Sequence, residues 1–448
     1  MLGIRGSAVR AEVRPTLRLA VPVVIGEIGW VTMGVVDVMM LGRVDATAIG
    51  GLSIGRALFF LVAIAGMGLL LGLDTVVSQS YGAGDRRGCR TWLVNGTWLA
   101  LALTPPSLLA CHVLGLAVAH FDIDPGVRPV ALSYLGAVRW CLLPLLLFFT
   151  FRRYLQAVGR VRPVVIALLS ANLVNVAGNW ILIHGRLGAP ALGARGAAWA
   201  TVLATTWLAL FLLAAIWLAE REERIQPAGT TLGADGARLA RLIRLGGLAA
   251  IQITVEVAAI TLVTTLVGRL APEALAAHQI ALNAASVTYM VPLGISSAAA
   301  VRVGRAIGRR DGRGAAAAGW CALGLGAAFM ALAGAAFALF PRLVVGAFTI
   351  DEAVVRAGVP LLYLAAVFQL FDGLQVVATG ALRGLGDTRS AAIAGIIAWW
   401  VLGVPVGTWL CFRAGLGVIG LWSGLSLGLV AAGCLLVPVW ARSAARLS

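Results

Sequence analysis

The sequence contains no lysine: all 35 basic residues among its 448 are arginine. A Walker A loop needs a lysine on the nucleotide phosphates, so the chain cannot hydrolyse ATP by that route. Charged residues make up only 12% of the chain, against about 25% in typical soluble domains. This shortage excludes a water-soluble globular domain, a disordered chain and a fibrous protein. Because the Walker A route to ATP hydrolysis is absent, any active transport by this chain must draw its energy from an ion gradient or from a separate energising subunit.

Cysteine and histidine are also scarce, with six and four residues. No CxxC motif occurs, so we interpret the cysteines as small packing residues. The histidines lack the spacing of a His-Glu-x-x-His metal site. Two Gly-x-Ser-x-Gly matches, at 51–55 and 424–428, lie in apolar segments rather than at a strand-to-helix turn. We predict that both are small-residue packing faces and that the chain is not an enzyme.

Apolar residues, in contrast, are abundant, at 60% of the chain with a mean hydropathy of +0.95. Apolar runs of about 20 residues recur, the length at which a helix crosses hydrocarbon. A membrane barrel would show short alternating segments instead. The sequence therefore predicts an all-α polytopic membrane protein with twelve transmembrane helices. Their approximate bounds are 17–41, 49–80, 92–119, 130–157, 163–184, 191–218, 242–268, 279–306, 315–340, 354–382, 391–412 and 417–440.

The two halves of the chain repeat at a shift of 226 residues. Under this shift Gly82, Asp85, Arg87 and Gly88 fall on Gly308, Asp311, Arg313 and Gly314. Because each half holds six spans, both halves insert the same way up. This predicts two six-helix bundles related by a pseudo-twofold axis along the membrane normal. The predicted lobes are 1–218 and 242–448, joined by a polar linker at 219–241.

Arginine is distributed unequally between the two predicted sides of the membrane. One side carries 25 arginines and the other carries nine, while Arg139 lies inside the fourth span. Since positive residues are retained on the cytoplasmic side, both termini and the linker are predicted to be cytoplasmic. The formal net charge of +16 thus reflects topology rather than a nucleic-acid partner.

Five acidic residues lie within apolar spans: Glu27, Asp37, Asp74, Glu256 and Asp372. Each costs about 2.5 kcal/mol or more at mid-bilayer, so each is a functional candidate. The alternative is a protonated acid, or one that is paired inside the bundle. Arg139 is the arginine we expect to be available as such a partner.

Amide and hydroxyl side chains share helix faces with these acids. Carboxylate, amide and hydroxyl oxygens suit a small hard cation, while a lone carboxylate in apolar surroundings could carry a proton. We predict ion or proton coupling at Glu256, Asp372, Asp37, Asn175, Asn179 and Thr201, with a candidate sodium site at Glu256 and Asp372. Candidate substrate-cavity residues are Gln252, Gln369, Gln375, Glu27 and Asn283. The alternative for the amides is hydrogen bonding between helices.

Several motifs, in order along about 430 residues, resemble one transporter family. They are Leu19-Ala-Val-Pro22, Met33-Gly-Val-Val-Asp37, Leu41-Gly-Arg43, Leu73-Asp-Thr-Val-Val-Ser-Gln79, Tyr81-Gly-Ala-Gly-Asp85, Arg152-Arg-Tyr-Leu-Gln156, Gly196-Ala-Ala-Trp-Ala-Thr201 and Gly380-Ala-Leu-Arg-Gly-Leu-Gly-Asp-Thr388. With the six-plus-six repeat, the chain resembles the multidrug and toxic compound extrusion (MATE) transporters, in particular their bacterial NorM-like branch.

The resemblance implies cation-coupled export of amphipathic, often cationic compounds by a V-shaped pair of lobes. It places Glu256 and Asp372 at the family's cation-binding acids of the second lobe, and Asp37 at the acid of the first-lobe site. The chain departs from the family at two positions. Many relatives have an acid where this chain has Asn179, and some have a tyrosine where it has Phe368.

The predicted function is therefore a secondary antiporter of the bacterial inner membrane, a monomer that acts on small molecules in exchange for protons or sodium. It needs no cofactor besides the coupling ion. The alternative is a flippase for a lipid-linked precursor, which should line its cleft with cations for pyrophosphate. Only Arg139 and Arg56 are placed to do so. A membrane-embedded enzyme would need a clustered catalytic set, and the sequence shows none.

Overall fold

The computed structural model describes residues 6–41, 46–118, 124–222 and 232–447. All regular elements in these ranges are helical, and the ranges contain no strand. Twelve of the helical segments in them are long and apolar enough to cross a membrane. The all-α fold with twelve spans, predicted from hydropathy, is thus confirmed.

The elements follow one another in a simple up-and-down order. They are α1 (Gly6–Leu41), α2 (Ala46–Leu70), α3 (Gly72–Gly82), α4 (Arg86–Ala117), α5 (Val127–Val138), η2 (Arg139–Cys141), α6 (Leu142–Ala157), α7 (Arg162–His184), α8 (Ala194–Glu222), α9 (Gly236–Val267), α10 (Pro272–Gly308), α11 (Gly312–Leu339), α12 (Pro341–Gly346), α13 (Glu352–Leu385), α14 (Arg389–Ile396), η3 (Ile397–Gly403), α15 (Val404–Phe412) and α16 (Gly417–Leu447). Three spans are composite: α2 with α3, α5 with η2 and α6, and α14 with the π-helical η3 and α15.

Several helices extend beyond the apolar segments that predict them. The described ends of the predicted linker 219–241 are helical, since α8 runs to Glu222 and α9 begins at Gly236. The polar turns at these ends continue the helices, and hydropathy alone does not detect them. Residues 223–231 of the linker lie outside the described residues.

The helices form two compact units. The first unit is Ile25–Ala250, and the second unit combines Met1–Val24 with Ile251–Ser448. The boundaries fall inside α1 and α9, so each of these helices contributes to both units. The predicted lobes 1–218 and 242–448 divide the chain elsewhere and stay a prediction.

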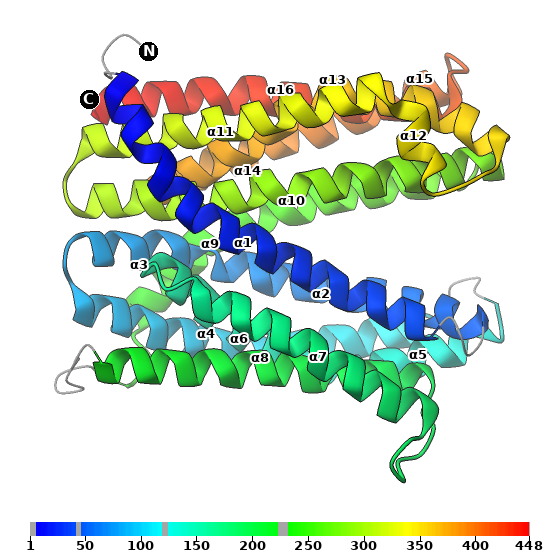
Figure 1. The fold of residues 1–448 in the computed structure, drawn as a ribbon, viewed down its shortest axis with the longest axis horizontal. Coiled ribbons are helices and arrows are strands. Elements are labelled where there is room, and N and C mark those ends of the chain that lie inside the picture. The colour runs from blue at the N-terminus through cyan, green and yellow to red at the C-terminus, as the bar shows by residue number, and fades with distance from the viewer. Residues whose placement is uncertain (1–5, 42–45, 119–123, 223–231, 448) are drawn as a thin grey trace. The chain divides into compact units, whose positions relative to one another are not determined.

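In the first unit, α2 packs on α5, and α8 packs on α5, α6 and α7 (Figure 1). Gly51 and Gly55 bring α2 close to α5, because a Cβ at Gly55 would lie 2.8 Å from the ring of Tyr134. The hydroxyl of Ser53 donates to the carbonyl of Ile49 at 2.8 Å, within its own helix. The first Gly-x-Ser-x-Gly match is therefore a packing face, as predicted.

In the second unit, α13 packs against α10, α11 and α16 (Figure 1). The α16 helix in turn packs on η3 and α15, where a Cβ on Gly424 would collide with the backbone of Gly403 and Gly407. Ser426 donates to the carbonyl of Trp422 at 2.8 Å. The second Gly-x-Ser-x-Gly match is thus also a packing face rather than a nucleophile.

The loops that repeat in the sequence have the same structural role in both units. Asp85 caps α4 by accepting a hydrogen bond from the backbone N–H of Gly88 at 2.7 Å. Asp311 caps α11 by accepting from Gly314 at 2.8 Å. An N-cap carboxylate satisfies one of the backbone donors left free at a helix start. The repeat of Asp and Gly three residues apart is therefore a repeat of helix caps.

A close helix contact also repeats at the same shift of 226 residues. In the first unit, a Cβ on Gly68 would lie 2.8 Å from the Cβ of Ala250. In the second unit, a Cβ on Gly294 would lie 3.1 Å from the backbone nitrogen of Val24. The glycines of α2 and α10 allow close approach to the backbones of α9 and α1. In each unit the contact holds the first portion of a helix that is divided between the units.

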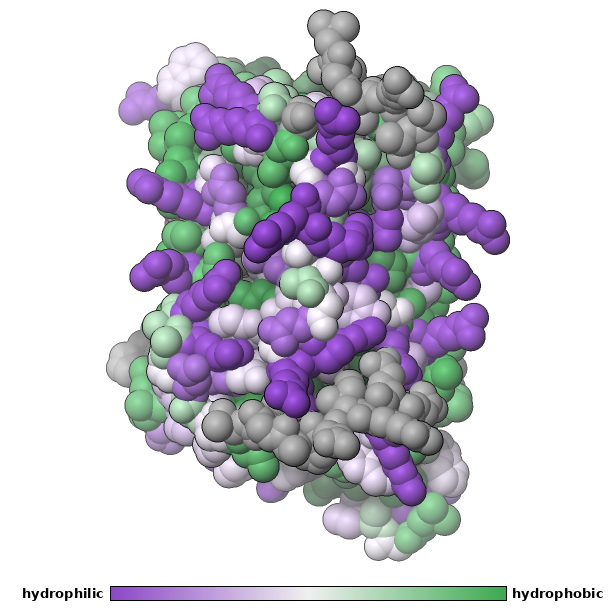
Figure 2. Space-filling view, turned by 90° about the vertical axis from the view of Figure 1, so that its left-hand side faces the viewer, coloured by the Kyte–Doolittle hydropathy of each residue, from purple (hydrophilic) through white to green (hydrophobic). Residues whose placement is uncertain are grey.

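Arginines are exposed in the repeated loops of both units. Arg86 and Arg87 are exposed at the start of α4, and Arg309, Arg310 and Arg313 are exposed around the start of α11. Hydrophilic side chains gather over the face drawn in Figure 2. Such residues suit a membrane surface rather than its interior.

We expect Gly424→Ala to destabilise the protein, because the added Cβ collides with backbone atoms of Gly403 and Gly407. Overpacking of this kind costs about 1–3 kcal/mol. The matched control is Gly324→Ala, since Gly324 is exposed on α11 and a Cβ there would meet no atom within 4 Å. Melting curves monitored by size-exclusion chromatography should show a lower melting temperature only for Gly424→Ala. Equal melting of both variants would contradict the packing role.

Candidate functional site

The structure brings together the predicted acid of the first unit and its three polar neighbours. Asp37 on α1 is 4% exposed. Its Oδ1 accepts from the Nδ2 of Asn175 at 3.0 Å and from that of Asn179 at 2.7 Å, both on α7. Its Oδ2 accepts from the hydroxyl of Thr201 on α8 at 3.1 Å. Three neutral donors therefore hold this carboxylate.

The Asp37 cluster has few further charges around it. Arg56 on α2 donates from Nη1 to the carbonyl of Gly34 at 3.2 Å, and its charge lies near enough to act on Asp37. Tyr134 on α5 is 2% exposed beside the same cluster. Oδ1 accepts two hydrogen bonds and Oδ2 accepts one, so a cation could approach only the remaining acceptor position of Oδ2 unless a donor is displaced.

The second unit holds a different arrangement, a pair of acids. Asp372 on α13 is 6% exposed, and its charge and that of Glu256 on α9 lie near enough to act on each other. In the described part of the chain, neither carboxyl group forms a hydrogen bond or an ion pair. Two like charges in this position repel, and one bound cation or proton would relieve the repulsion.

Three of the predicted substrate-cavity residues are buried in the second unit with the acid pair. Gln252 is 7% exposed and lies beside Gly395 on α14. Gln369 donates to the hydroxyl of Thr288 on α10 at 2.6 Å. Gln375 is 2% exposed, and its Oε1 has no hydrogen-bond partner among the described residues. Their role towards a substrate stays a prediction.

The other two predicted cavity residues lie elsewhere. Asn283 is exposed on α10. Glu27 belongs to the first unit, where it forms an ion pair with Arg152 of α6. The side chain of Arg152 is 1% exposed and that of Glu27 is 13% exposed, so the arginine end of this pair is buried. The presence of an acid at position 27 is thus explained by its ion pair inside the bundle, which is the structural alternative to a functional role.

The expectation that Arg139 pairs with an acid is wrong for the described residues. Its guanidinium lies 5.6 Å from the ring centroid of Trp140. The acids pair instead with α6, where Arg153 lies 3.4 Å from Asp74 and Arg152 binds Glu27. The 25 arginines counted on the cytoplasmic side include Arg152 and Arg153, which lie near the end of the predicted fourth span, 130–157. Their only signal was the Arg-Arg pair just before the predicted end of the fourth span.

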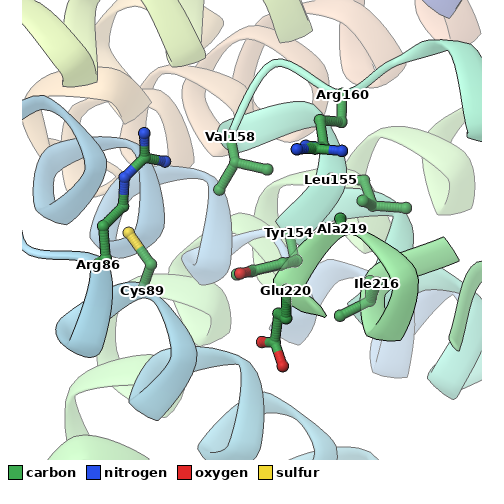
Figure 3. Close-up of a pocket in the computed structure, with 9 residues that line it drawn as sticks. All are labelled: Arg86, Cys89, Tyr154, Leu155, Val158, Arg160, Ile216, Ala219 and Glu220. Carbon is green, nitrogen blue, oxygen red and sulfur yellow. The ribbon is translucent and has the colours of Figure 1, made fainter. Parts of the chain in front are cut away.

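The first unit also contains a small pocket at the ends of α4, α6 and α8 (Figure 3). Arg86 and Cys89 from α4 lie on one side, and Tyr154 and Glu220 lie across from them. None of the predicted coupling or substrate residues lines it. It is therefore not the predicted drug cavity.

Metal chemistry has little support in the described residues. No three His, Cys, Asp or Glu side chains gather there in a way that could hold a metal ion. The acid pair offers two carboxyl groups only. The predicted sodium site at Glu256 and Asp372 would need further oxygen ligands, and it stays a prediction.

Twelve candidate membrane spans, with acids buried in both compact units, are typical of polytopic membrane transporters. The MatE family model matches residues 22–181 and 249–409, one stretch in each half of the chain. The chain belongs to the MATE family of multidrug efflux transporters, in its NorM-like branch.

Similar curated proteins cover nearly the whole chain. A multidrug resistance protein NorM of Burkholderia vietnamiensis is 38% identical over 429 residues, which are 94% of this chain and 92% of that protein. A probable multidrug resistance protein NorM of Mesorhizobium japonicum is 35% identical over 445 residues, 97% of this chain and 94% of that protein.

Solved structures show the same fold at lower identity. A multidrug resistance MATE transporter in an outward-facing conformation has a TM-score of 0.87 at 18% identity, covering 100% of this chain and 99% of its own. A eukaryotic MATE transporter has a TM-score of 0.86 at 19% identity, covering 98% of this chain and 99% of its own.

We expect Glu27→Gln to destabilise the protein strongly, because it leaves the buried guanidinium of Arg152 without its carboxylate. Removing one partner of a buried pair costs about 3–5 kcal/mol. The double variant Glu27→Gln/Arg152→Gln should regain much of this loss in thermal melts. The control Asp235→Asn removes the ion pair with Arg238, in which the side chains of Arg238 and Asp235 are 34% and 42% exposed. It should lower the free energy of unfolding by less than about 1 kcal/mol. Additive losses in the double variant would contradict the pairing.

Proposed function

We propose that this chain is a secondary active antiporter that exports amphipathic, often cationic drugs and toxic compounds in exchange for protons or sodium. Transport proceeds by alternating access. Family membership supports the export of drugs, and the acids inside the membrane support the coupling to an ion. We take the substrate class from the NorM relatives, whose names describe them as multidrug resistance proteins.

The observation that carries the proposal is the pair formed by Glu256 and the buried Asp372. A site with two carboxyl groups and no cation of its own among the described residues has a strong electrostatic preference for one positive charge. A proton, a sodium ion or a cationic drug can each supply that charge. Because only one of them neutralises the pair at a time, drug and ion compete.

Competition of this kind is the minimum that antiport requires. The ion stabilises one facing state and the drug stabilises the other, each by its differential affinity for the two states. The Asp37 cluster has three hydrogen-bond donors on its carboxylate and is therefore the weaker candidate for exchange. It stays in the proposal as a second coupling site with Asn175, Asn179 and Thr201.

The protein is a multi-pass membrane protein, and we place it in the bacterial inner membrane. The bias of 25 arginines against nine supports cytoplasmic termini. We further propose that it acts as a monomer on small molecules, without a nucleic-acid partner and without a cofactor besides the coupling ion. The comparisons do not favour the alternative of a lipid-precursor flippase.

We expect Glu256→Gln and Asp372→Asn each to lower ion-driven efflux of ethidium at least about tenfold, because either change removes the charge that binds the ion. Both variants should reach the membrane at wild-type levels. The control Glu352→Gln alters an exposed acid at the start of α13 and should transport normally. Wild-type efflux from both site variants would refute the site.

The same assay separates the two coupling ions when the sodium and proton gradients are varied independently. Efflux should stop when the gradient of the coupling ion is collapsed. If efflux stops only when an uncoupler collapses the proton gradient, the coupling ion is the proton. If efflux stops only when the sodium gradient is removed, the coupling ion is sodium. Efflux that persists without either gradient would refute secondary antiport.

A further inference from the structure

His278 lies at the centre of a hydrogen-bond network in the second unit. It is 0% exposed on α10. Its Nδ1 lies 3.0 Å from Nε1 of Trp422 on α16, and its Nε2 lies 2.9 Å from the hydroxyl oxygen of Thr264 on α9. In the part of the chain that the structure describes, no acidic or basic side chain bonds to this imidazole.

The partners fix where the proton of His278 lies. The indole Nε1 of Trp422 can only donate, so Nδ1 must be an acceptor without a proton. The hydroxyl of Thr264 already donates to the carbonyl of Ile260 at 2.9 Å, so it accepts from Nε2–H. A chain of donors runs from Trp422 through His278 and Thr264 to Ile260. It permits one state only, the neutral ring protonated at Nε2.

This network reaches both helices that carry the acid pair. The ring of Trp422 meets His278 edge-on at 5.8 Å between centroids and stacks on Phe368 of α13 at 6.0 Å. Phe368 precedes Asp372 by about one helical turn, and Thr264 follows Glu256 by about two turns on α9. Phe368 and Trp422 are 6% and 1% exposed, so both rings are enclosed by close-packed neighbours.

We propose that His278 is a permanently neutral positioning residue that fixes the turn of α13 preceding Asp372 through Trp422 and Phe368. This inference rests on the proposed coupling function of the acid pair. His278 takes no part in carrying protons. A second proton on Nδ1 would point directly at the indole N–H, and two donors cannot share that space.

The network also gives a role to Phe368. The ring here has no hydroxyl to offer an ion. It instead transmits the position of Trp422 to the turn of α13 that precedes Asp372. Precision of an ion site depends on such supporting contacts as well as on its ligands.

Two substitutions of His278 separate the two halves of the network. Asparagine branches at the same atom as imidazole, so His278→Asn can keep an acceptor for Trp422 while it loses the bond to Thr264. His278→Gln can reach Thr264 with its amide nitrogen but leaves the indole N–H without an acceptor. Trp422→Phe keeps the stacked ring and removes that N–H.

The readout is the concentration of coupling ion that gives half-maximal ethidium efflux in proteoliposomes. For His278→Gln and for Trp422→Phe it should rise about fivefold, the equivalent of about one net hydrogen bond. The double variant should be no worse than either single one. For His278→Asn it should stay within about twofold of wild type. The maximal rate of ethidium efflux at saturating coupling ion should be unchanged in all variants.

Nitrogen NMR of protein labelled in its four histidines tests the protonation state separately. His278 should show the Nε2–H neutral tautomer throughout about pH 5.5 to 8.5, the range in which ordinary histidines titrate. The controls are His112→Gln on the exposed side of α4 and Trp409→Phe on the exposed side of α15, and both should transport like wild type.

Wild-type ion dependence in both His278→Gln and Trp422→Phe would overturn the positioning role. Titration of His278 within the tested range would overturn its neutral state. Failure of the antiport proposal looks different, because wild-type efflux would then ignore both ion gradients. In that case the tautomer seen by NMR still decides whether the network exists.

Discussion

The cost of an ionised carboxyl group inside a membrane governs the polar interior of this protein. Each of the five acids in the spans needs compensation, and the structure offers three kinds. Two acids pair with adjacent arginines of α6. Asp37 accepts hydrogen bonds from three neutral donors. Glu256 and Asp372 have only each other among the described residues, and this arrangement alone calls for a mobile cation.

The acid pair cannot relieve its repulsion by a shift of α13, because small residues hold this helix against its neighbours. A Cβ on Gly373 would lie 3.1 Å from the Cβ of Met330 on α11, and Gly380 faces the backbone of Ser296 on α10. The hydroxyl of Ser296 also donates to the carbonyl of Val376 at 2.7 Å. Under the proposed function, the close packing of α13 leaves the binding of a positive charge as the way to relieve the repulsion.

Local sequence patterns predict the features that depend on one helix or one turn. Hydropathy finds the twelve spans, since a helix in lipid must be apolar over about 20 residues. The Asp37 cluster is also predictable, because Asn175 and Asn179 are four apart and so share a face of α7. The caps by Asp85 and Asp311 follow from the repeat of Asp and Gly three residues apart.

Features that depend on distant partners are not visible in the sequence. Arg152 and Arg153 lie near the end of the predicted fourth span, where charge normally means exposure to water. Only the approach of Asp74 on α3 and of Glu27 on α1 makes them interior residues. His278 carries no motif at all. Its role depends on two helices that meet it from opposite sides, a geometry that spacing along α10 cannot encode.

The two shared helices connect the ion sites to the architecture. The compact units divide α1 after Val24 and α9 after Ala250, positions related by the same shift of 226 residues as the repeat. Asp37 lies on α1 beyond its boundary, and Glu256 lies on α9 beyond the equivalent one. The first portion of each helix is held in the other unit, where a glycine of α2 or α10 touches its backbone. Under the proposed function, a change of charge at either acid would act on a helix whose residues are divided between the two units.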